Sequence, residues 1–161
     1  MRTLLLALAL LLVLPATAFA LPPFTTSPKT STGTTPQSEL HSPAVGCHAT
    51  YDRFVIRARR ATPNYDVRYV SRIVQDGSGA TVSLLGRYRL RVRFRDARGH
   101  TANGTTDLIP NLTPRCPNLR QVKHAGDFEG VVTLGIGLRK RTGFRVFRLT
   151  NPTRVVIDVA T

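Results

Sequence analysis

Between Arg87 and Arg95 every second residue is an arginine, and the residues between them are apolar. The side chains of a β-strand point alternately to its two faces. This period of two therefore predicts a strand over residues 87–95, with all its arginines on one face. The apolar positions are Tyr88, Leu90, Val92 and Phe94. Their face must lie against a core, so the chain is expected to build a sheet that buries one side and exposes the other.

Further segments have the composition of strands and are separated by turn residues. They cover residues 51–58, 67–74, 81–85, 119–125, 131–138, 144–150 and 154–159. Asp76-Gly77-Ser78-Gly79 is typical of a hairpin turn, and residues 96–117 predict a long loop. No long amphipathic helix is expected. About eight short strands with regular turn signals predict an all-β fold, either a sandwich or a barrel.

The first residues differ from this pattern. Met1-Arg2 is followed by an uncharged apolar run over residues 4–14, Pro15, and small residues that offer cleavage after Ala18 or Ala20. This order is typical of a secretory signal peptide, predicted as residues 1–20. The alternative, an uncleaved membrane anchor, fits less well because a spanning helix needs about 20 apolar residues. No cysteine follows the run, so we expect release rather than a lipid anchor.

Residues 21–46 are rich in serine, threonine and proline. Such a segment has little apolar surface to offset the entropy of ordering, so it predicts a disordered linker. One folded domain is then expected over residues 47–161. Cys47 and Cys116 predict a disulfide in an exported chain. Free thiols or a metal site are the weaker alternatives, because the pair has no further metal-type ligand at a suitable spacing.

The chain carries 23 Lys and Arg against 9 Asp and Glu, a net charge of +14, which becomes +13 when Arg2 leaves with the signal peptide. This charge attracts polyanions. Nucleic acid is the usual partner of so basic a chain, but export argues against it. Wall polymers, anionic lipids and acidic proteins remain. The candidate ligand-binding residues are Arg87, Arg89, Arg91, Arg93, Arg95, Arg139, Lys140 and Arg141. Alternatively, the arginine row is a solvated face paired with carboxylates.

Motifs for catalysis are weak. The chain has no HExxH, GxSxG or phosphate-cradling loop pattern. Asp127 and Glu129 could perform acid–base chemistry, with His124 nearby. The favoured interpretation is instead a turn in which Phe128 packs inward and the carboxylates pair with arginines. We therefore expect a protein that is not an enzyme and that needs no metal or cofactor.

Three stretches carry a family resemblance: residues 51–56, residues 126–138, and the closing segment 144–159 with its Asn-Pro turn and final Asp158. Together with residues 76–79 and 84–90 they resemble the AMIN-like domain of secreted proteins and lipoproteins of GC-rich Gram-positive bacteria, over residues 47–161. The resemblance implies a small β-sandwich of two antiparallel sheets. It also implies a non-catalytic module that associates with the cell envelope by binding peptidoglycan.

The lipobox cysteine of many such lipoproteins is missing here, and the Cys47–Cys116 pair is a further departure from the family pattern. The resulting hypothesis is a secreted module that binds peptidoglycan or an anionic wall polymer. The alternative is a protein-interaction module, such as an inhibitor or accessory subunit of another exported protein. That alternative predicts an exposed apolar patch and capture that salt does not weaken.

Overall fold

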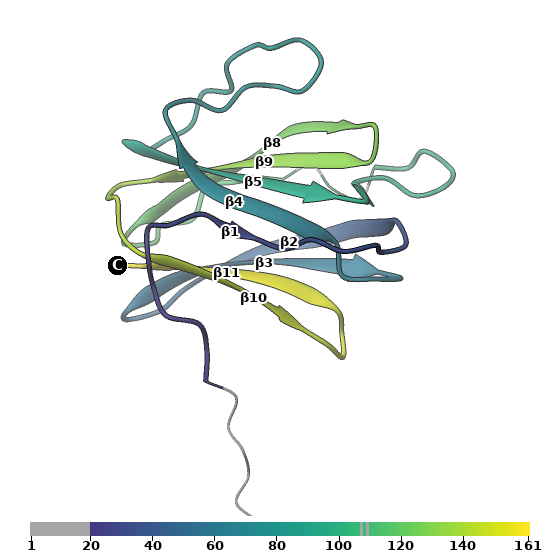
Figure 1. The fold of residues 1–161 in the computed structure, drawn as a ribbon. Helices are drawn as coiled ribbons and strands as arrows, with labels where there is room; N and C mark the ends of the chain where they lie inside the picture. The colour runs from purple at the N-terminus through teal and green to yellow at the C-terminus, as the bar shows by residue number, and fades with distance from the viewer. Residues whose placement is uncertain (1–19, 107, 109) are drawn as a thin grey trace, which may run out of the picture.

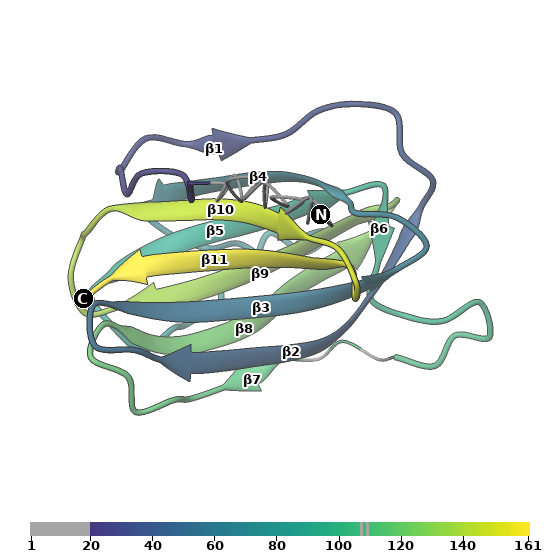
Figure 2. The same ribbon diagram turned by 90° about the horizontal axis from the view of Figure 1, so that it is seen from below.

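The structure, a computed structural model, describes residues 20–106, 108 and 110–161. The predicted signal peptide, residues 1–20, lies outside the described residues except for Ala20. The described chain consists of strands and loops without a helix, arranged as two facing layers (Figures 1 and 2). The prediction of an all-β fold is therefore confirmed.

The larger layer is a sheet of six strands in the order β1-β4-β5-β9-β8-β7, and all its neighbouring pairs are antiparallel. Its strands are β1 (Lys29–Thr30), β4 (Asn64–Val70), β5 (Tyr88–Arg95), β7 (Asn111–Leu112), β8 (Leu119–Phe128) and β9 (Val131–Leu138). β8 and β9 form a hairpin, and β5 pairs with the other edge of β9. The arginine-rich strand thus lies inside a sheet rather than at its edge.

The smaller layer has five strands in the order β10-β11-β3-β2-β6. They are β2 (Ser38–Cys47), β3 (Tyr51–Arg59), β6 (Ala97–Arg98), β10 (Phe144–Leu149) and β11 (Arg154–Ala160). Only the short β2–β6 contact is parallel among the pairs that the described residues form. The sandwich of two sheets is confirmed, with eleven strands in the described residues rather than about eight.

Alternate side chains of the two sheets fill the space between the layers. Leu90, Val92 and Phe94 of β5 are completely buried, whereas the arginines between them are partly exposed. They share one core with Phe54 and Ile56 of β3. The two faces predicted for the strand are therefore confirmed, and the arginines lie on the outer face of the six-stranded sheet.

The structure corrects the disordered linker predicted for residues 21–46, because two parts of this segment pair with the sandwich. β1 pairs with β4, and Thr25 exchanges two backbone hydrogen bonds, of 3.2 and 2.9 Å, with Phe144 of β10. We call residues 24–31 the N-terminal strap, since they run along one side of the sandwich, where they pair with β4 of the larger sheet and with β10 at the edge of the smaller one (Figure 2). The strap is held largely through its backbone, which composition does not reveal.

The second part of the segment, residues 38–47, is β2. Its Ser38 and Leu40 are almost fully buried. The register of β2 against β3 shifts between His41 and Ala44, at a bulge that contains Pro43. Proline is tolerated at bulges and where a strand has no neighbour on one side. β6 pairs only with the start of β2, so the stretch around Pro43 meets that condition.

Residues 71–87, which we call the covering loop, connect β4 to β5 above the outer face of the six-stranded sheet (Figure 1). The strand predicted over 81–85 is wrong, and the strand predicted over 67–74 ends at Val70. Ile73 and Leu84 are apolar because they pack with Ala125 of β8 in a second small core, not because they belong to strands. The turn predicted over residues 76–79 is confirmed by the bridge between Val74 and Thr81.

Two glycines of β9 leave the space that the covering loop occupies. A Cβ atom on Gly137 would lie 1.9 Å from the carbonyl oxygen of Leu85, and one on Gly135 would lie 2.8 Å from Cδ1 of Leu84. Atoms of larger residues cannot occupy these positions without moving the loop. Because Gly135 and Gly137 have no side chains, the covering loop can lie directly on the backbone of β9.

The two layers are also joined covalently. Cys47 at the end of β2 and Cys116 before β8 form a disulfide with Cα atoms 5.2 Å apart, as predicted. Beside it, the buried carboxylate of Asp52 accepts backbone N–H groups of Asn118 and Leu119, both at 2.7 Å. This end of the sandwich is therefore fixed by a covalent bond and by two charge-assisted hydrogen bonds.

Candidate functional site

The arginine row on β5 is not a free ladder of charges. Asp66 of neighbouring β4 lies 3.6 Å from the guanidinium of Arg91 and accepts hydrogen bonds from Arg68. Burial raises the pKa of Asp66, but the hydrogen bond from Arg68 and the charges of Arg68, Arg91 and Arg95 outweigh it, so the pKa is lowered. The middle of the row is therefore partly neutralised by a carboxylate on the same face.

The beginning of the row lies in a different environment. Arg87, Arg120 and Arg139 line an open cavity of about 400 Å³ together with Gly86. We call this cavity the three-arginine pocket. Its cations come from three places: Arg87 from the end of the covering loop, Arg120 from β8, and Arg139 from the residue after β9. Segments far apart in the sequence thus place three guanidinium groups around one space.

Backbone hydrogen bonds fix the positions of these arginines. The N–H of Arg87 donates to the carbonyl of Leu138 at 2.7 Å, and the N–H of Arg139 donates to the carbonyl of Asn118 at 2.9 Å. Gly86 has a φ of +102°, and a Cβ atom there would lie 2.6 Å from the carbonyl oxygen of Leu138. Only glycine suits both the backbone conformation and the close approach. The pocket therefore rests on rigid backbone contacts.

The positive charge of the pocket has no carboxylate partner among the described residues. In the part of the chain that the structure describes, no ion pair involves Arg87, Arg120 or Arg139. The closest ion pairs of the described carboxylates are Arg98–Glu39, Arg68–Asp66, Arg53–Asp158, Arg145–Asp158 and His100–Asp127. Three like charges around one cavity repel each other, and an anion bound between them relieves that repulsion. Arginine suits this role because its planar fork donates two parallel hydrogen bonds to a carboxylate or phosphate.

The structure brings together Arg87 and Arg139 of the predicted ligand-binding residues. Lys140 and Arg141 do not line the pocket. The N–H of Lys140 donates to Oδ1 of Asn118 at 2.8 Å, and the guanidinium of Arg141 lies over the ring of Tyr69, 4.5 Å from its centre. Of the remaining predicted residues, Arg89, Arg91, Arg93 and Arg95 follow β5 away from the pocket.

Arg120 is the residue of this pocket that sequence reasoning missed. It stands alone in its segment, without the repetition that marks residues 87–95. A signal was nevertheless available, because residues 119–125 and 131–138 are adjacent predicted strands with a Gly-containing turn. Pairing them as a hairpin places residue 120 beside the end of the second strand, where Arg139 follows.

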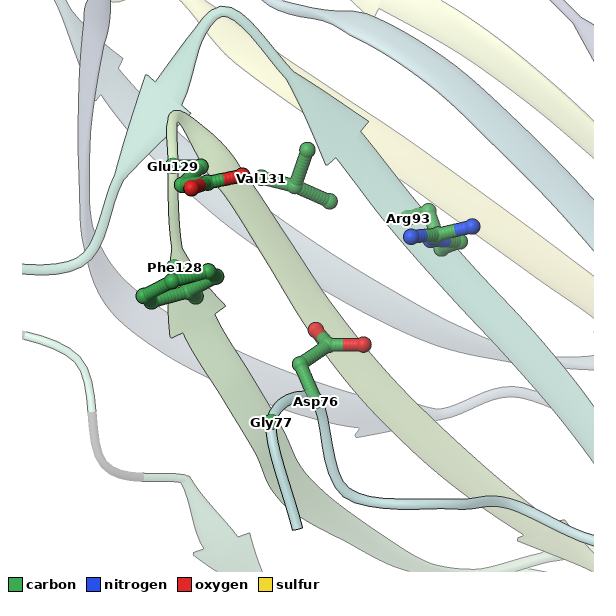
Figure 3. Close-up of a pocket in the computed structure, with 6 residues that line it drawn as sticks. All are labelled: Asp76, Gly77, Arg93, Phe128, Glu129 and Val131. Carbon is green, nitrogen blue, oxygen red and sulfur yellow. The ribbon is translucent and has the colours of Figure 1, made fainter. Parts of the chain in front are cut away.

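A second cavity, of about 260 Å³, lies at the other end of the same sheet face (Figure 3). Its lining residues are Asp76, Gly77, Arg93, Phe128, Glu129 and Val131. We call it the hairpin pocket, because the β8–β9 turn forms one wall and the tip of the covering loop forms another. It combines carboxylates, a guanidinium and an aromatic ring, in contrast to the purely cationic lining of the first pocket.

The predicted acidic pair is divided between two environments. Oδ2 of Asp127 accepts the backbone N–H of Gly99 at 2.9 Å and contacts Nδ1 of His100 at 2.7 Å. Glu129 is exposed and lines the hairpin pocket. The turn interpretation expected Phe128 to pack inward. Its side chain is instead 59% exposed. The carboxylate of Asp127 pairs with a histidine rather than with an arginine.

His124 lies near these acidic residues and is half-buried. Burial lowers its pKa, although the charges of Asp127 and Asp76 and a hydrogen bond with the backbone of Gly126 act in the opposite direction. Its Nε2 atom has no hydrogen-bond partner in the described residues. The fold therefore favours the neutral imidazole.

The described residues hold one group of potential metal-ligating atoms within 4.8 Å of one another: Cys47, Asp52 and Cys116. Both sulfur atoms belong to the disulfide, and Asp52 accepts the two backbone N–H groups described above. These groups are committed to holding the layers together. Residues 20–106, 108 and 110–161 contain no helix with the length and apolar character needed to cross a membrane.

Comparison with known proteins agrees with this architecture. No curated protein and no solved structure matches the chain. The family model of the AMIN-like domain matches residues 39–161, which include β2 and every later strand of both sheets. The matched region begins at the start of β2 rather than at the predicted boundary of residue 47, in agreement with the structure. Since this match covers most of its length, the chain belongs to the AMIN-like domain family.

Proposed function

We propose that this protein is an exported, non-catalytic module of the cell envelope that holds anionic groups of peptidoglycan or of an attached wall polymer in the three-arginine pocket. Family membership suggests an envelope-associated module in general. The disulfide is consistent with a location outside the cytoplasm. The observation that carries the finer proposal is the set of three guanidinium groups that line one cavity without an ion pair among the described residues.

The chemistry of wall polymers suits such a pocket. Carboxylates of peptide stems and phosphates of attached polymers both accept paired hydrogen bonds from arginine. The net charge of +14 adds a long-range attraction that brings the domain to an anionic surface before the specific contact forms. Binding in place of catalysis is supported by the engagement of Asp127 with Gly99 and His100, which separates it from Glu129, its partner in the predicted acidic pair.

A retention assay tests the proposal. The protein is mixed with purified peptidoglycan, either with its anionic polymers attached or after their removal, and the retained fraction is measured. We expect retention that falls strongly when Arg87, Arg120 and Arg139 are replaced together by glutamine. If only the sample with attached polymers retains the protein, the ligand is the polymer; retention by both samples assigns it to peptidoglycan.

The matched control replaces three other arginines, Arg57, Arg72 and Arg154, by glutamine. This variant loses the same net charge but keeps the pocket intact. It should retain most of the binding. Equal loss in both variants would show that only total charge matters, and retention of the wild-type protein by neither sample would reject the proposal.

The alternative, a protein-interaction module, is tested by the same experiment. Capture of one exported protein, unchanged by salt and by the three glutamine substitutions, would support it. The large apolar side chains exposed in the described residues are Leu21, Val74, Leu85 and Phe128. Three of them belong to the covering loop and the end of β8, so this alternative would also use the outer face of the six-stranded sheet.

A further inference from the structure

The hairpin pocket is built from three separate elements that meet at one end of the six-stranded sheet. Asp76 and Gly77 come from the tip of the covering loop, Arg93 from β5, and Phe128 and Glu129 from the end of β8 and the turn that follows it. In Figure 3 the carboxylate of Asp76 projects over β9, with Phe128 on one side and Arg93 on the other. The three-arginine pocket contains none of these residues.

The carboxylate of Asp76 is held in place rather than free in solution. Its backbone N–H donates to the carbonyl of Ala125 at 3.0 Å, and Ile73 and Leu84 anchor the loop on the sheet. A Cβ atom on Gly126 would lie 2.4 Å from Oδ2 of Asp76, so the glycine leaves the space that the carboxylate occupies. The acidic wall of the pocket is therefore preformed.

Polar atoms in and beneath this pocket lack partners. Oδ2 of Asp76, Nε of Arg93 and Oγ1 of Thr133 are buried atoms without a hydrogen bond to the described residues. Thr133 lies in register between Arg93 on β5 and Gly126 on β8, directly below Asp76. Buried polar groups without partners are rare in folded proteins, and each needs a reason. These three atoms are themselves enclosed, so a ligand would contact the parts of Asp76 and Arg93 that line the pocket.

The charges of the pocket restrict the ligand. An anion would be repelled by the carboxylates of Asp76 and Glu129, whereas a cation would be attracted by these carboxylates and opposed by Arg93. The described residues bring no three metal-ligating atoms together in this pocket. A hydroxyl group, by contrast, both donates and accepts hydrogen bonds. It can donate to the carboxylate of Asp76 while it accepts from the guanidinium of Arg93.

Phe128 adds an apolar surface beside these polar groups. Its side chain is 59% exposed, more than that of any other large apolar residue in the described chain. The face of an aromatic ring carries negative potential and attracts the slightly positive C–H groups of a flat ligand. A ligand that presents hydroxyl groups on its rim and C–H groups on its face is a sugar ring.

We propose that the hairpin pocket binds a neutral saccharide ring, which stacks on Phe128 and exchanges hydroxyl hydrogen bonds with Asp76 and Arg93. The site is separate from the three-arginine pocket and would serve the glycan part of a polymer whose anionic groups bind there. The inference goes beyond the proposed function and stands or falls on its own residues.

The experiment uses the disulfide-bonded protein and chitotetraose, a neutral oligosaccharide, in a calorimetric or NMR titration. We expect saturable binding, weakened about tenfold or more by Asp76→Asn, which keeps the shape but removes the charged acceptor. Phe128→Ala should weaken binding similarly, whereas Phe128→Tyr should preserve it. Leu85→Ala is the matched control, because Leu85 is 51% exposed and does not line this pocket.

Further outcomes separate the two sites. The Arg87, Arg120 and Arg139 glutamine variant should bind chitotetraose as the wild type does, even if it no longer binds the wall polymer. Phe128→Leu distinguishes ring stacking from simple apolar contact, since leucine is apolar but not flat. Absence of chitotetraose binding by the wild type, or binding that survives both Asp76→Asn and Phe128→Ala, would overturn the proposal.

Discussion

Thr133 carries a hydroxyl that is almost fully enclosed, at 1% exposure, and that has no hydrogen-bond partner in the described residues. An unsatisfied buried polar group costs about 1–3 kcal/mol, and valine has nearly the same shape as threonine without that group. We therefore expect Thr133→Val to leave the free energy of unfolding unchanged or to raise it by about 1 kcal/mol. Urea denaturation measures the difference.

The control for this prediction is Thr142→Val. Oγ1 of Thr142 accepts a hydrogen bond from Asn118 at 2.9 Å and donates one to the carbonyl of Ala160 at 2.6 Å. Its loss should lower the free energy of unfolding by about 1 kcal/mol or more. Similar destabilisation by both substitutions would mean that Thr133 is also hydrogen-bonded, for instance through an ordered water.

Gly137 shows how strictly the outer face of β9 must stay bare. Replacement by alanine would place a methyl group 1.9 Å from the carbonyl oxygen of Leu85, so the covering loop must move. We expect Gly137→Ala to lower the free energy of unfolding by about 1–3 kcal/mol, the range for overpacking. Gly46→Ala, whose new methyl group would lie 3.5 Å from Nε2 of His48, should change stability far less.

The lowered pKa of His124 predicts how stability depends on pH. The unfolded chain binds a proton near the ordinary value of 6.5, whereas burial disfavours protonation in the folded state. The stabilising contribution is therefore complete above pH 6.5 and is lost as the pH falls through the lower pKa of the folded protein. Melting temperatures measured across this range should decrease toward acid pH.

His124→Gln tests the assignment of this pH dependence. The variant has no titrating group at this position, so its melting temperature should change less between pH 6.5 and more acidic conditions. An identical pH profile in the variant and the wild type would assign the dependence to other groups.

Among the elements, the disulfide joins the end of β2 in one sheet to the segment that precedes β8 in the other. It spans 69 residues, and closing a loop of that length removes enough freedom from the unfolded chain to stabilise the fold by about 4 kcal/mol. The double variant Cys47→Ala/Cys116→Ala should lose stability of that order in urea denaturation. A loss below about 1 kcal/mol would show that the unfolded chain is already restricted at this point.

The elements that sequence reasoning predicted well are those with a strong period or a clear turn. β5, β9 and β10 match residues 87–95, 131–138 and 144–150 to within one residue at each end. Each has apolar residues that only the core can accept, and each is bounded by glycine, proline or polar residues. Local chemistry determines these strands, so the sequence alone was sufficient to predict them.

The elements that were predicted wrongly depend on distant partners. β1 and β2 lie in a segment rich in serine, threonine and proline, and their stability comes from backbone pairing with β4 and β3. The apolar residues of 81–85 instead cover a sheet face, for which a strand pattern is not required. Composition describes what a segment can bury, but not which edge is available for it to pair with.

The candidate sites were predictable only in part for the same reason. Arg87 and Arg139 were singled out because they lie in visible clusters of charge. The distinction between Arg139, which lines the pocket, and Arg141, which lies on Tyr69, depends on the hairpin geometry. The hairpin pocket depends on how the covering loop folds back, so its combination of Asp76 with Phe128 has no local signal in the sequence.

Across the molecule as a whole, some of the positive side chains stabilise the fold and others are available for a ligand. On the outer face of the five-stranded sheet, Arg53 and Arg145 both form ion pairs with the buried carboxylate of Asp158. Their guanidinium groups also lie over aromatic rings, those of Phe24, Tyr51 and Phe147. These cations stabilise the fold. The arginines of the three-arginine pocket have no carboxylate partner in the described residues, although the guanidinium of Arg87 lies over the ring of Tyr88, 5.8 Å from its centre. Their charge therefore remains available for a ligand.

This distribution predicts different salt dependence for the two proposed sites. Exposed charges are screened beyond about 10 Å at 0.1 M salt and beyond about 3 Å at 1 M. Retention on the anionic wall polymer should therefore fall steeply as salt is raised. Binding of chitotetraose should change little, because neither its hydroxyl groups nor its C–H groups carry net charge. Equal sensitivity of both ligands to salt would contradict the assignment of two chemically different pockets.

The glycines of β9 affect which parts of such a domain can change in sequence. Because Gly135 and Gly137 offer no side chains, the covering loop rests on the backbone of β9. It is held there by the side chains of Ile73 and Leu84 and by a backbone hydrogen bond from Asp76 to Ala125. The tip, which supplies Asp76, can change its residues without disturbing either sheet. If Asp76 contacts a ligand as proposed, exchange of residues 75–80 alone would change the ligand preference while both sheets stay the same.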